Sequence, residues 1–141
     1  VLDVYCGVGL FSLFMAERGG QVIGVEFNPS AVDDFLYNLS GYDQVKIYDA
    51  AAEEVLPHLQ LVPDVIVLDP PRGGISPTVL DSMVELNPEK IVYISCDPAT
   101  LGRDLLRFGK QGYSLTQSTP LDMFPQTYHI ESINLLKKTT P

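Results

Sequence analysis

Cys96 is the residue whose position best suits covalent chemistry, because it directly precedes a predicted helix. The apolar residues 91–95 predict a buried strand, and Asp97-Pro98 is typical of a helix N-terminus, with aspartate as the cap and proline in the first turn. The partial positive charge at a helix N-terminus favours thiolate over thiol, so Cys96 is a candidate nucleophile. The alternative is a buried, apolar cysteine, which is the commoner state of a free thiol.

Glu131 is the candidate general base. It stands between Ile130 and Ile133, an apolar setting that favours such a role for a carboxylate. The alternative is a strand-end carboxylate paired with a lysine or arginine. The neighbouring His129 is interpreted as a hydrogen-bonded structural histidine, since the sequence offers it no catalytic partner.

Two glycines after the first predicted strand indicate a nucleoside-binding site. Gly7 and Gly9 precede a predicted helix and would let a ligand approach the backbone closely at its N-terminus. Glu26 ends the next strand, nineteen residues after Gly7, where a carboxylate can accept hydrogen bonds from ribose hydroxyls. The alternative is a tight turn with a surface carboxylate.

Two cofactors compete for this site. A dinucleotide would favour a third glycine at position 12, where Ser12 stands. S-adenosylmethionine carries no phosphate and has a positively charged sulfonium, which suits the acids Asp3, Glu26 and Asp69 at the strand ends. The sequence therefore favours S-adenosylmethionine.

Two further features have the residue types to contact phosphate. Asp69-Pro70-Pro71-Arg72 follows a strand, and Arg72 has the fork geometry to meet a phosphate; a stiffened loop with a surface ion pair is the alternative. Arg103, Arg107 and Lys110 share one face of the last predicted helix. A solvated face with cations near the helix C-terminus is favoured there, and a phosphate-contact stripe is the alternative.

Strand and helix patterns alternate along the chain and decide where these residues meet. Short apolar runs predict strands over residues 1–5, 22–26, 45–48, 65–68, 91–95, 113–117 and 130–136. Helical patterns cover residues 10–17, 28–39, 52–60, 77–86 and 97–110. This alternation is typical of an α/β fold, a mostly parallel sheet with helices on both faces, whose ligands bind outside the carboxyl ends of the strands. If the fourth strand lies between the first and fifth, Cys6 and Cys96 are too far apart for a disulfide, and a packing role is favoured for Cys6.

The composition bounds the class of protein. The 141 residues fit one domain, and two cysteines are too few for a disulfide scaffold or a four-cysteine metal site. No apolar run reaches the ~18 residues that a membrane span needs. The formal net charge of −9 argues against binding nucleic acid by bulk electrostatics. All of that net charge comes from residues 1–70, which contain eleven acidic and two basic residues, whereas residues 71–141 contain seven of each.

The sequence resembles, over essentially its whole length, the catalytic domain of the RNA uracil-5-methyltransferase family, which methylates ribosomal or transfer RNA. Its most specific carriers are Ser95-Cys96-Asp97-Pro98-Ala99-Thr100-Leu101 and Asp122-Met123-Phe124-Pro125-Gln126-Thr127, the latter completed by His129-Ile130-Glu131. The other carriers are Leu2-Asp3-Val4-Tyr5-Cys6-Gly7-Val8-Gly9, Gly24-Val25-Glu26 and Leu68-Asp69-Pro70-Pro71-Arg72. The glycine turn among them is shared by all related methyltransferases.

This resemblance implies a fold, a cofactor and a set of roles. The fold would be the Rossmann-like fold of S-adenosylmethionine-dependent methyltransferases, with a seven-stranded, mostly parallel sheet. Cys96 would add to carbon 6 of uracil and Glu131 would remove the proton from carbon 5, with no metal. The partner would be RNA with a flipped-out or looped uridine, in the cytoplasm. The residues that contact S-adenosylmethionine would be Asp3, Tyr5, Gly7, Gly9, Glu26 and Asp69, with Glu26 on the ribose.

The sequence departs from the family pattern beside the cofactor. The family often has a polar residue where Leu10 stands and an Asn or Asp near Ala51, so adenine contacts would be made differently here, with Asp49 as one candidate. The family also contributes a cofactor contact and an RNA-binding domain upstream of this segment, with an iron–sulfur cluster in some members. We therefore expect residues 1–141 to be a single catalytic domain from the C-terminal part of a longer protein.

Three alternatives remain open at this point. The first alternative is another methyltransferase of the same fold, such as an amino-methylating enzyme with an Asp-Pro-Pro loop. The second is a nicotinamide-dependent dehydrogenase. The third is non-catalytic: a cofactor-binding unit that is inactive without its upstream RNA-binding region.

Overall fold

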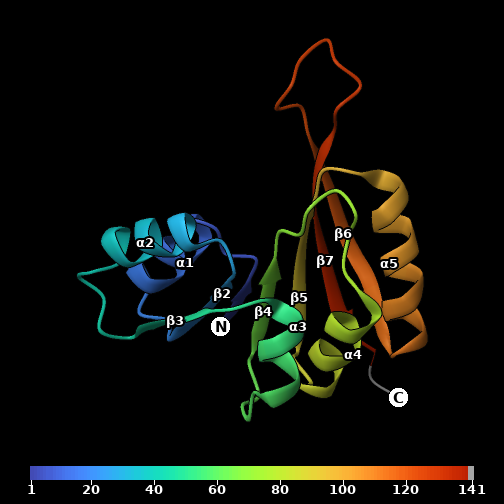
Figure 1. The fold of residues 1–141 in the computed structure, drawn as a ribbon. Helices are drawn as coiled ribbons and strands as arrows, with labels where there is room; N and C mark the ends of the chain where they lie inside the picture. The colour runs from blue at the N-terminus through green and yellow to red at the C-terminus, as the bar shows by residue number, and fades with distance from the viewer. Residues whose placement is uncertain (140–141) are drawn as a thin grey trace.

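Seven strands form one sheet in the computed structural model, which describes residues 1–139. The strands are β1 (Leu2–Val4), β2 (Val22–Glu26), β3 (Val45–Asp49), β4 (Val65–Leu68), β5 (Lys90–Ser95), β6 (Tyr113–Leu121) and β7 (Glu131–Lys138). Their order in the sheet is β3-β2-β1-β4-β5-β7-β6 (Figure 1). Strands β1 to β5 pair in parallel, whereas β7 is antiparallel to both β5 and β6. The predicted α/β fold class is confirmed. Strand β4 lies between β1 and β5, which is the condition stated for the separation of Cys6 from Cys96, and both cysteines are free.

Two of the helices begin at the caps that the sequence predicts, Asn28 and Asp97. The helices are α1 (Leu10–Glu17), α2 (Pro29–Asn38), α3 (Ala52–Val55), α4 (Pro77–Glu85) and α5 (Pro98–Lys110), with a 3-10 turn, η1 (Leu56–His58), after α3. The side chains of Asn28, Ser76 and Asp97 cap α2, α4 and α5, each directly before a proline. None of the helices in residues 1–139 combines the length and hydropathy needed to cross a membrane.

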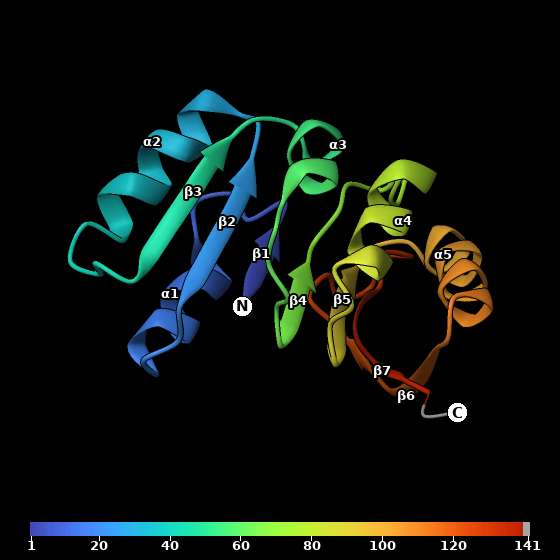
Figure 2. The same cartoon turned by 90° about the horizontal axis from the view of Figure 1, so that it is seen from below.

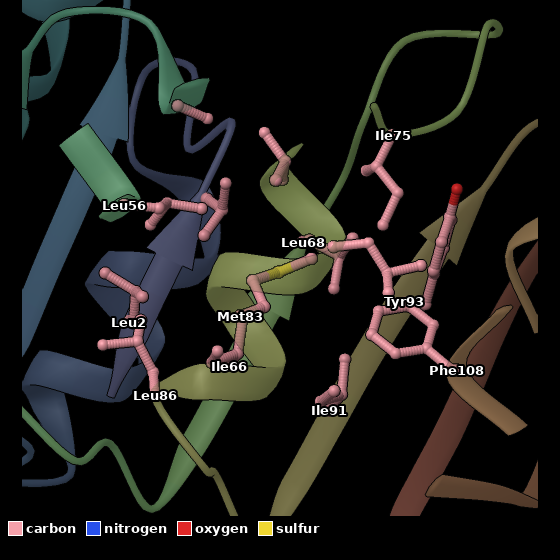
Figure 3. Close-up of a cluster of buried hydrophobic side chains, with 14 of the residues drawn as sticks. Leu2, Leu56, Ile66, Leu68, Ile75, Met83, Leu86, Ile91, Tyr93 and Phe108 are labelled. Atoms are coloured by element: carbon pink, nitrogen blue, oxygen red, sulfur yellow. The ribbon is translucent and has the colours of Figure 1, made fainter. Parts of the chain in front are cut away.

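The two faces of the sheet carry separate apolar cores. On one face, β1, β4 and β5 pack beneath α3, α4 and α5 around residues such as Leu68, Met83 and Phe108 (Figure 3). On the other face, α1 and α2 cover β2 and β3 with a smaller core that includes Cys6 and Phe35. Figure 2 shows α1 and α2 beside β2 and β3, and α5 next to the hairpin of β6 and β7. These two layers hold the carboxyl ends of β1, β4 and β5 at one edge of the sheet.

Two elements differ from the predicted ones. The helix expected over residues 52–60 ends at Val55 and continues only as η1, because Pro57 has no N–H for a helical hydrogen bond. Strand β6 runs to Leu121 instead of ending near residue 117, since β7 continues to pair with it past a bulge between Leu115 and Gln117. The extended β6–β7 hairpin carries the connecting loop well beyond the sheet edge (Figure 1).

Candidate active site

A cavity of about 650 Å³ lies at the carboxyl ends of β1, β4 and β5. It brings together candidate residues that are far apart in the sequence: Tyr5, Gly7, Asp69, Cys96 and Glu131. The rest of its wall is mostly apolar and consists of Cys6, Val8, Leu10, Phe11, Ile94, Leu121, Met123, Phe124 and Ile133. Two thiols, those of Cys6 and Cys96, and two carboxylates therefore share one largely apolar cavity.

The junction between β5 and α5 holds Cys96 in the cavity wall. The Ser95 hydroxyl accepts a hydrogen bond from the Asp97 N–H and donates one to the Asp97 carbonyl. The Asp97 side chain accepts the Thr100 N–H at 2.8 Å, and this bond is the main reason that the pKa of Asp97 lies below its usual range. Cys96 is free and half-buried, and the helix predicted to follow it does begin at Pro98.

Glu131 is the first residue of β7 and is also half-buried. Its neighbours Ile130 and Ile133 are 42% and 38% exposed, so the expected apolar setting is only partly closed to water. Burial, together with the negative charge of Glu131, raises the pKa of Asp69. The mutual repulsion of these two carboxylates makes the cavity suited to a cationic ligand.

The glycine turn has the left-handed backbone that its residue types predict. Gly7 and Gly9 have φ angles of 53° and 89°, and Tyr5 before them also has a positive φ of 61°. A Cβ atom at Gly9 would lie 2.5 Å from Leu39, whereas the space beside Gly7 is open. Gly9 is thus needed for packing against α2, and Gly7 leaves the backbone accessible from the cavity.

Glu26 braces this turn through its carboxylate. One oxygen accepts the Gly7 N–H at 3.0 Å, and the other accepts the N–H groups of Phe27 and Asn28. Glu26 itself is not among the residues that line the cavity. Its contact with a ribose stays a prediction, and its observed contacts fix the end of β2 against the turn after β1.

Asp3 does not line the cavity. Its side chain is buried between β1 and α1, where the Ser12 hydroxyl donates to one carboxylate oxygen at 2.6 Å. The other oxygen has no hydrogen-bond partner among the described residues. Burial raises the pKa of Asp3 to about 6, against the ordinary value of 3.8. Its observed contact joins β1 to α1, the two elements that flank the glycine turn.

A second cavity, of about 600 Å³, shares Tyr5 with the first. It is also lined by Phe27, Ala51 and Pro71, which lie one to three residues beyond the ends of β2, β3 and β4. Phe27 and Pro71 were not predicted as site residues, although their position shortly after strand ends was a usable signal. Asp49 is exposed and lines neither cavity.

Asp104 is a buried carboxylate that sequence analysis overlooked. It accepts hydrogen bonds from the Tyr93 hydroxyl at 3.0 Å and from the guanidinium of Arg103. Arg107 lies 3.6 Å from the same carboxylate. Arg103 and Arg107 thus face a buried charge, whereas the sequence favoured a purely solvated face. A signal existed: Asp104 falls between Leu101 and Phe108 at helical spacing, on the core side of α5.

Residues 59–139 match the family model described as tRNA (uracil-5-)-methyltransferase. An uncharacterized RNA methyltransferase of Clostridium acetobutylicum is 41% identical over 98% of this chain. The chain spans only 31% of the length of that relative.

Solved structures share the fold. A tRNA (uracil-54, C5)-methyltransferase of Pyrococcus abyssi, in complex with S-adenosyl-L-homocysteine, superposes with a TM-score of 0.81 and 33% identity, over 96% of this chain and 33% of its own. A precorrin-6y C5,15-methyltransferase of Geobacter metallireducens has a TM-score of 0.79, 18% identity and coverage of 97% and 78%. The second likeness shows the fold alone: the Rossmann-like fold of methyltransferases, as the sequence predicted.

Proposed function

The chain belongs to the tRNA (uracil-5-)-methyltransferase family, and from this premise we propose that it transfers a methyl group from S-adenosylmethionine to carbon 5 of a uridine in ribosomal or transfer RNA. The observation that carries the proposal is the shared cavity, where the Cys96 thiol and the Glu131 carboxylate both lie beside the glycine turn. Methylation of uracil at carbon 5 needs one activated thiol and one general base. An amino-methylating enzyme of the same fold needs no thiol.

S-adenosylmethionine fits the residues present. The facing carboxylates of Asp69 and Glu131 suit a positive charge, and the open space beside Gly7 leaves backbone free to approach a ligand. The two cavities that meet at Tyr5 offer room for the amino-acid and adenosine portions of one molecule. When bound, S-adenosylmethionine supplies a methyl group on a positively charged sulfur. Tyr5, Gly7 and Asp69 are the residues proposed to hold it.

Cys96 and Glu131 divide the chemistry on the uracil ring. Carbon 5 of uracil is a poor nucleophile, and addition of the Cys96 thiolate to carbon 6 moves an electron pair onto carbon 5 and oxygen 4. Once carbon 5 carries the methyl group, Glu131 accepts the remaining proton from that carbon. The electrons of that C–H bond restore the double bond between carbons 5 and 6, and the thiolate leaves. The target base must be unstacked to reach the cavity.

Transcripts made with 5-fluorouridine test these roles. Carbon 5 then carries fluorine and offers no proton to Glu131, so a covalent protein–RNA complex should accumulate and survive denaturing electrophoresis. Cys96→Ala should abolish the complex. Cys6→Ala, which removes the other thiol in the same cavity wall, should retain it. A complex of undiminished yield with Cys96→Ala would refute the assignment of the nucleophile.

We also propose that RNA affinity depends on polypeptide outside these residues. The relatives are about three times as long as this chain, and the net charge of −9 gives it little electrostatic attraction for RNA. The 141-residue chain should therefore bind transcripts far more weakly than a full-length relative, as measured by filter binding at one salt concentration. Equal affinities would contradict this division of labour.

A further inference from the structure

The loop that connects β6 and β7, residues 122–130, presents apolar side chains to solvent at the mouth of the first cavity. Tyr128 is 89% exposed, and Met123, Phe124 and Ile130 in or beside the same loop are also exposed. Met123 and Phe124 line the cavity as well. Figure 1 shows this loop extending away from the body of the sheet. Exposed apolar groups clustered beside a cavity indicate a surface that a partner covers.

Within this loop, an aromatic stack leads from the cavity wall to solvent. The rings of Phe124 and His129 meet edge to face, with centroids 6.0 Å apart. The Tyr128 ring also packs against the histidine, with centroids 4.2 Å apart and planes inclined by 40°. Because Tyr128 is almost fully exposed, the face of its ring that points away from His129 is free.

Hydrogen bonds hold this stack in place. The Thr127 hydroxyl donates to the Phe124 carbonyl at 2.7 Å and accepts the His129 N–H. Arg72, from the loop after β4, donates to Nδ1 of His129 at 3.2 Å. The stack is therefore tied to the body of the protein on the side that carries Asp69, and an exposed guanidinium stands next to it.

We propose that this aromatic stack binds the RNA nucleotide next to the target uridine, with Tyr128 stacking on the neighbouring base and Arg72 contacting the backbone phosphate. The proposal rests on the proposed function. A uridine turned into the cavity leaves the adjoining nucleotide at its mouth, where the free face of Tyr128 lies. Stacking on an aromatic ring suits any base, and a guanidinium meets phosphate through two N–H groups.

Titration of covalent complex formation tests the proposal. For a 5-fluorouridine transcript that forms the complex, Tyr128→Ala should raise the RNA concentration at half-maximal rate by roughly tenfold, as loss of one stacked base implies. The maximal rate should stay within about twofold, because Tyr128 does not line the cavity with Cys96. Tyr128→Phe should behave as the wild type, whereas Tyr128→Leu should behave as Tyr128→Ala. The matched control is Tyr37→Ala, which removes a tyrosine of 83% exposure from α2.

The outcomes separate this proposal from the one on which it rests. A covalent complex with the same half-maximal concentration in Tyr128→Ala and the wild type would overturn the stacking contact and leave Cys96 as the nucleophile. Wild-type affinity in Tyr128→Leu would equally overturn stacking, since leucine keeps only apolar area. Absence of any complex with the wild type would overturn both proposals.

A direct optical readout needs no reaction. The chain contains no tryptophan, so Tyr128→Trp places a single fluorophore at the outer face of the stack. Its fluorescence should be quenched by the same transcript, since a stacked base quenches indole, and Tyr37→Trp should not respond. Equal responses of the two tryptophans to bound RNA would contradict the contact.

Discussion

The buried carboxylate of Asp104 in α5 accepts a hydrogen bond of 3.1 Å from the backbone N–H of Ile75, in the loop that follows β4. The same loop carries Asp69 and Arg72, and α5 begins just after Cys96. The Arg103 guanidinium strengthens the link, because it bonds both to Asp104 and to the Gly73 carbonyl at 2.8 Å. The loop after β4 and the helix α5 are thus joined through one buried carboxylate.

Replacing this carboxylate should destabilise the fold. Asp104→Asn removes the charge that faces Arg103 and turns an amide N–H₂ toward groups that are themselves donors, so the free energy of unfolding should fall by about 2–3 kcal/mol. Asp81→Asn, at an exposed aspartate of α4, should change it by less than about 0.5 kcal/mol. Urea unfolding measures both, and equal effects would mean that the Asp104 contacts contribute little.

Replacing a glycine by alanine should lower stability in the loop after β4 and raise it in α5. Gly74 has a φ of 72°, and a Cβ atom there would collide with Asp104 and Arg103. Gly74→Ala should therefore lower stability by about 2 kcal/mol. Gly102 lies within α5 with open space around it, so Gly102→Ala should raise stability by roughly 0.5–1 kcal/mol. Thermal unfolding compares the two, and a stable Gly74→Ala variant would contradict the close approach.

Asp3 should make stability depend on pH. Its pKa is about 6 in the folded chain against 3.8 ordinarily, so between these values the folded state holds a proton that the unfolded state releases. Stability should therefore fall as pH rises from 4 to 6, by on the order of 3 kcal/mol. The pKa of Asp69 is also raised, so Asp69 changes stability with pH in the same direction. Its contribution cancels when the wild type is compared with a variant that keeps Asp69.

The difference in unfolding free energy between the wild type and Asp3→Asn isolates this effect. We expect the wild type to lose stability relative to Asp3→Asn as the pH rises from 4 to 6, and the difference to become constant above pH 6. A difference that stays constant from pH 4 to pH 7 would show that Asp3 is already ionised when buried.

Arg72 should contribute to the salt dependence of RNA binding. If it contacts one phosphate of a single strand, Arg72→Gln should make the slope of log affinity against log salt concentration shallower by about 0.7. Lys46→Gln, at an exposed lysine of β3 outside both cavities, should leave the slope unchanged. A slope unaffected by Arg72→Gln would show that Arg72 does not contact a phosphate.

Features that depend on local sequence were predictable. The caps at Asn28 and Asp97 and the apolar strand runs are decided within a few residues, so the helix starts and the sheet class agree with the structure. The end of β6 was not predictable in this way, because it is set by pairing with β7 across the hairpin.

The site was predictable where it follows strand ends and was not where long-range packing decides. Tyr5, Asp69 and Cys96 follow the carboxyl ends of β1, β4 and β5 and meet Gly7 in one cavity. Glu131 reaches the same cavity from the first residue of the antiparallel strand β7. The contact of Asp3 with the cofactor stays a prediction, and the observed partner of its side chain is Ser12 of α1. Helical spacing places Asp104 on the core side of α5, but it does not reveal the bond to Ile75, which lies 29 residues away in the sequence.

The position of the covalent bond between protein and RNA distinguishes Cys96 from Cys6 as the nucleophile. Glu131→Gln, which cannot accept the proton from carbon 5, should stall on ordinary uridine RNA with the methylated base still attached. After trypsin and nuclease digestion, mass spectrometry should find a methylated uridine nucleotide on the peptide of residues 91–103, which contains Cys96. A nucleotide on the peptide of residues 1–18, which contains Cys6, or normal turnover with no trapped nucleotide, would contradict the account.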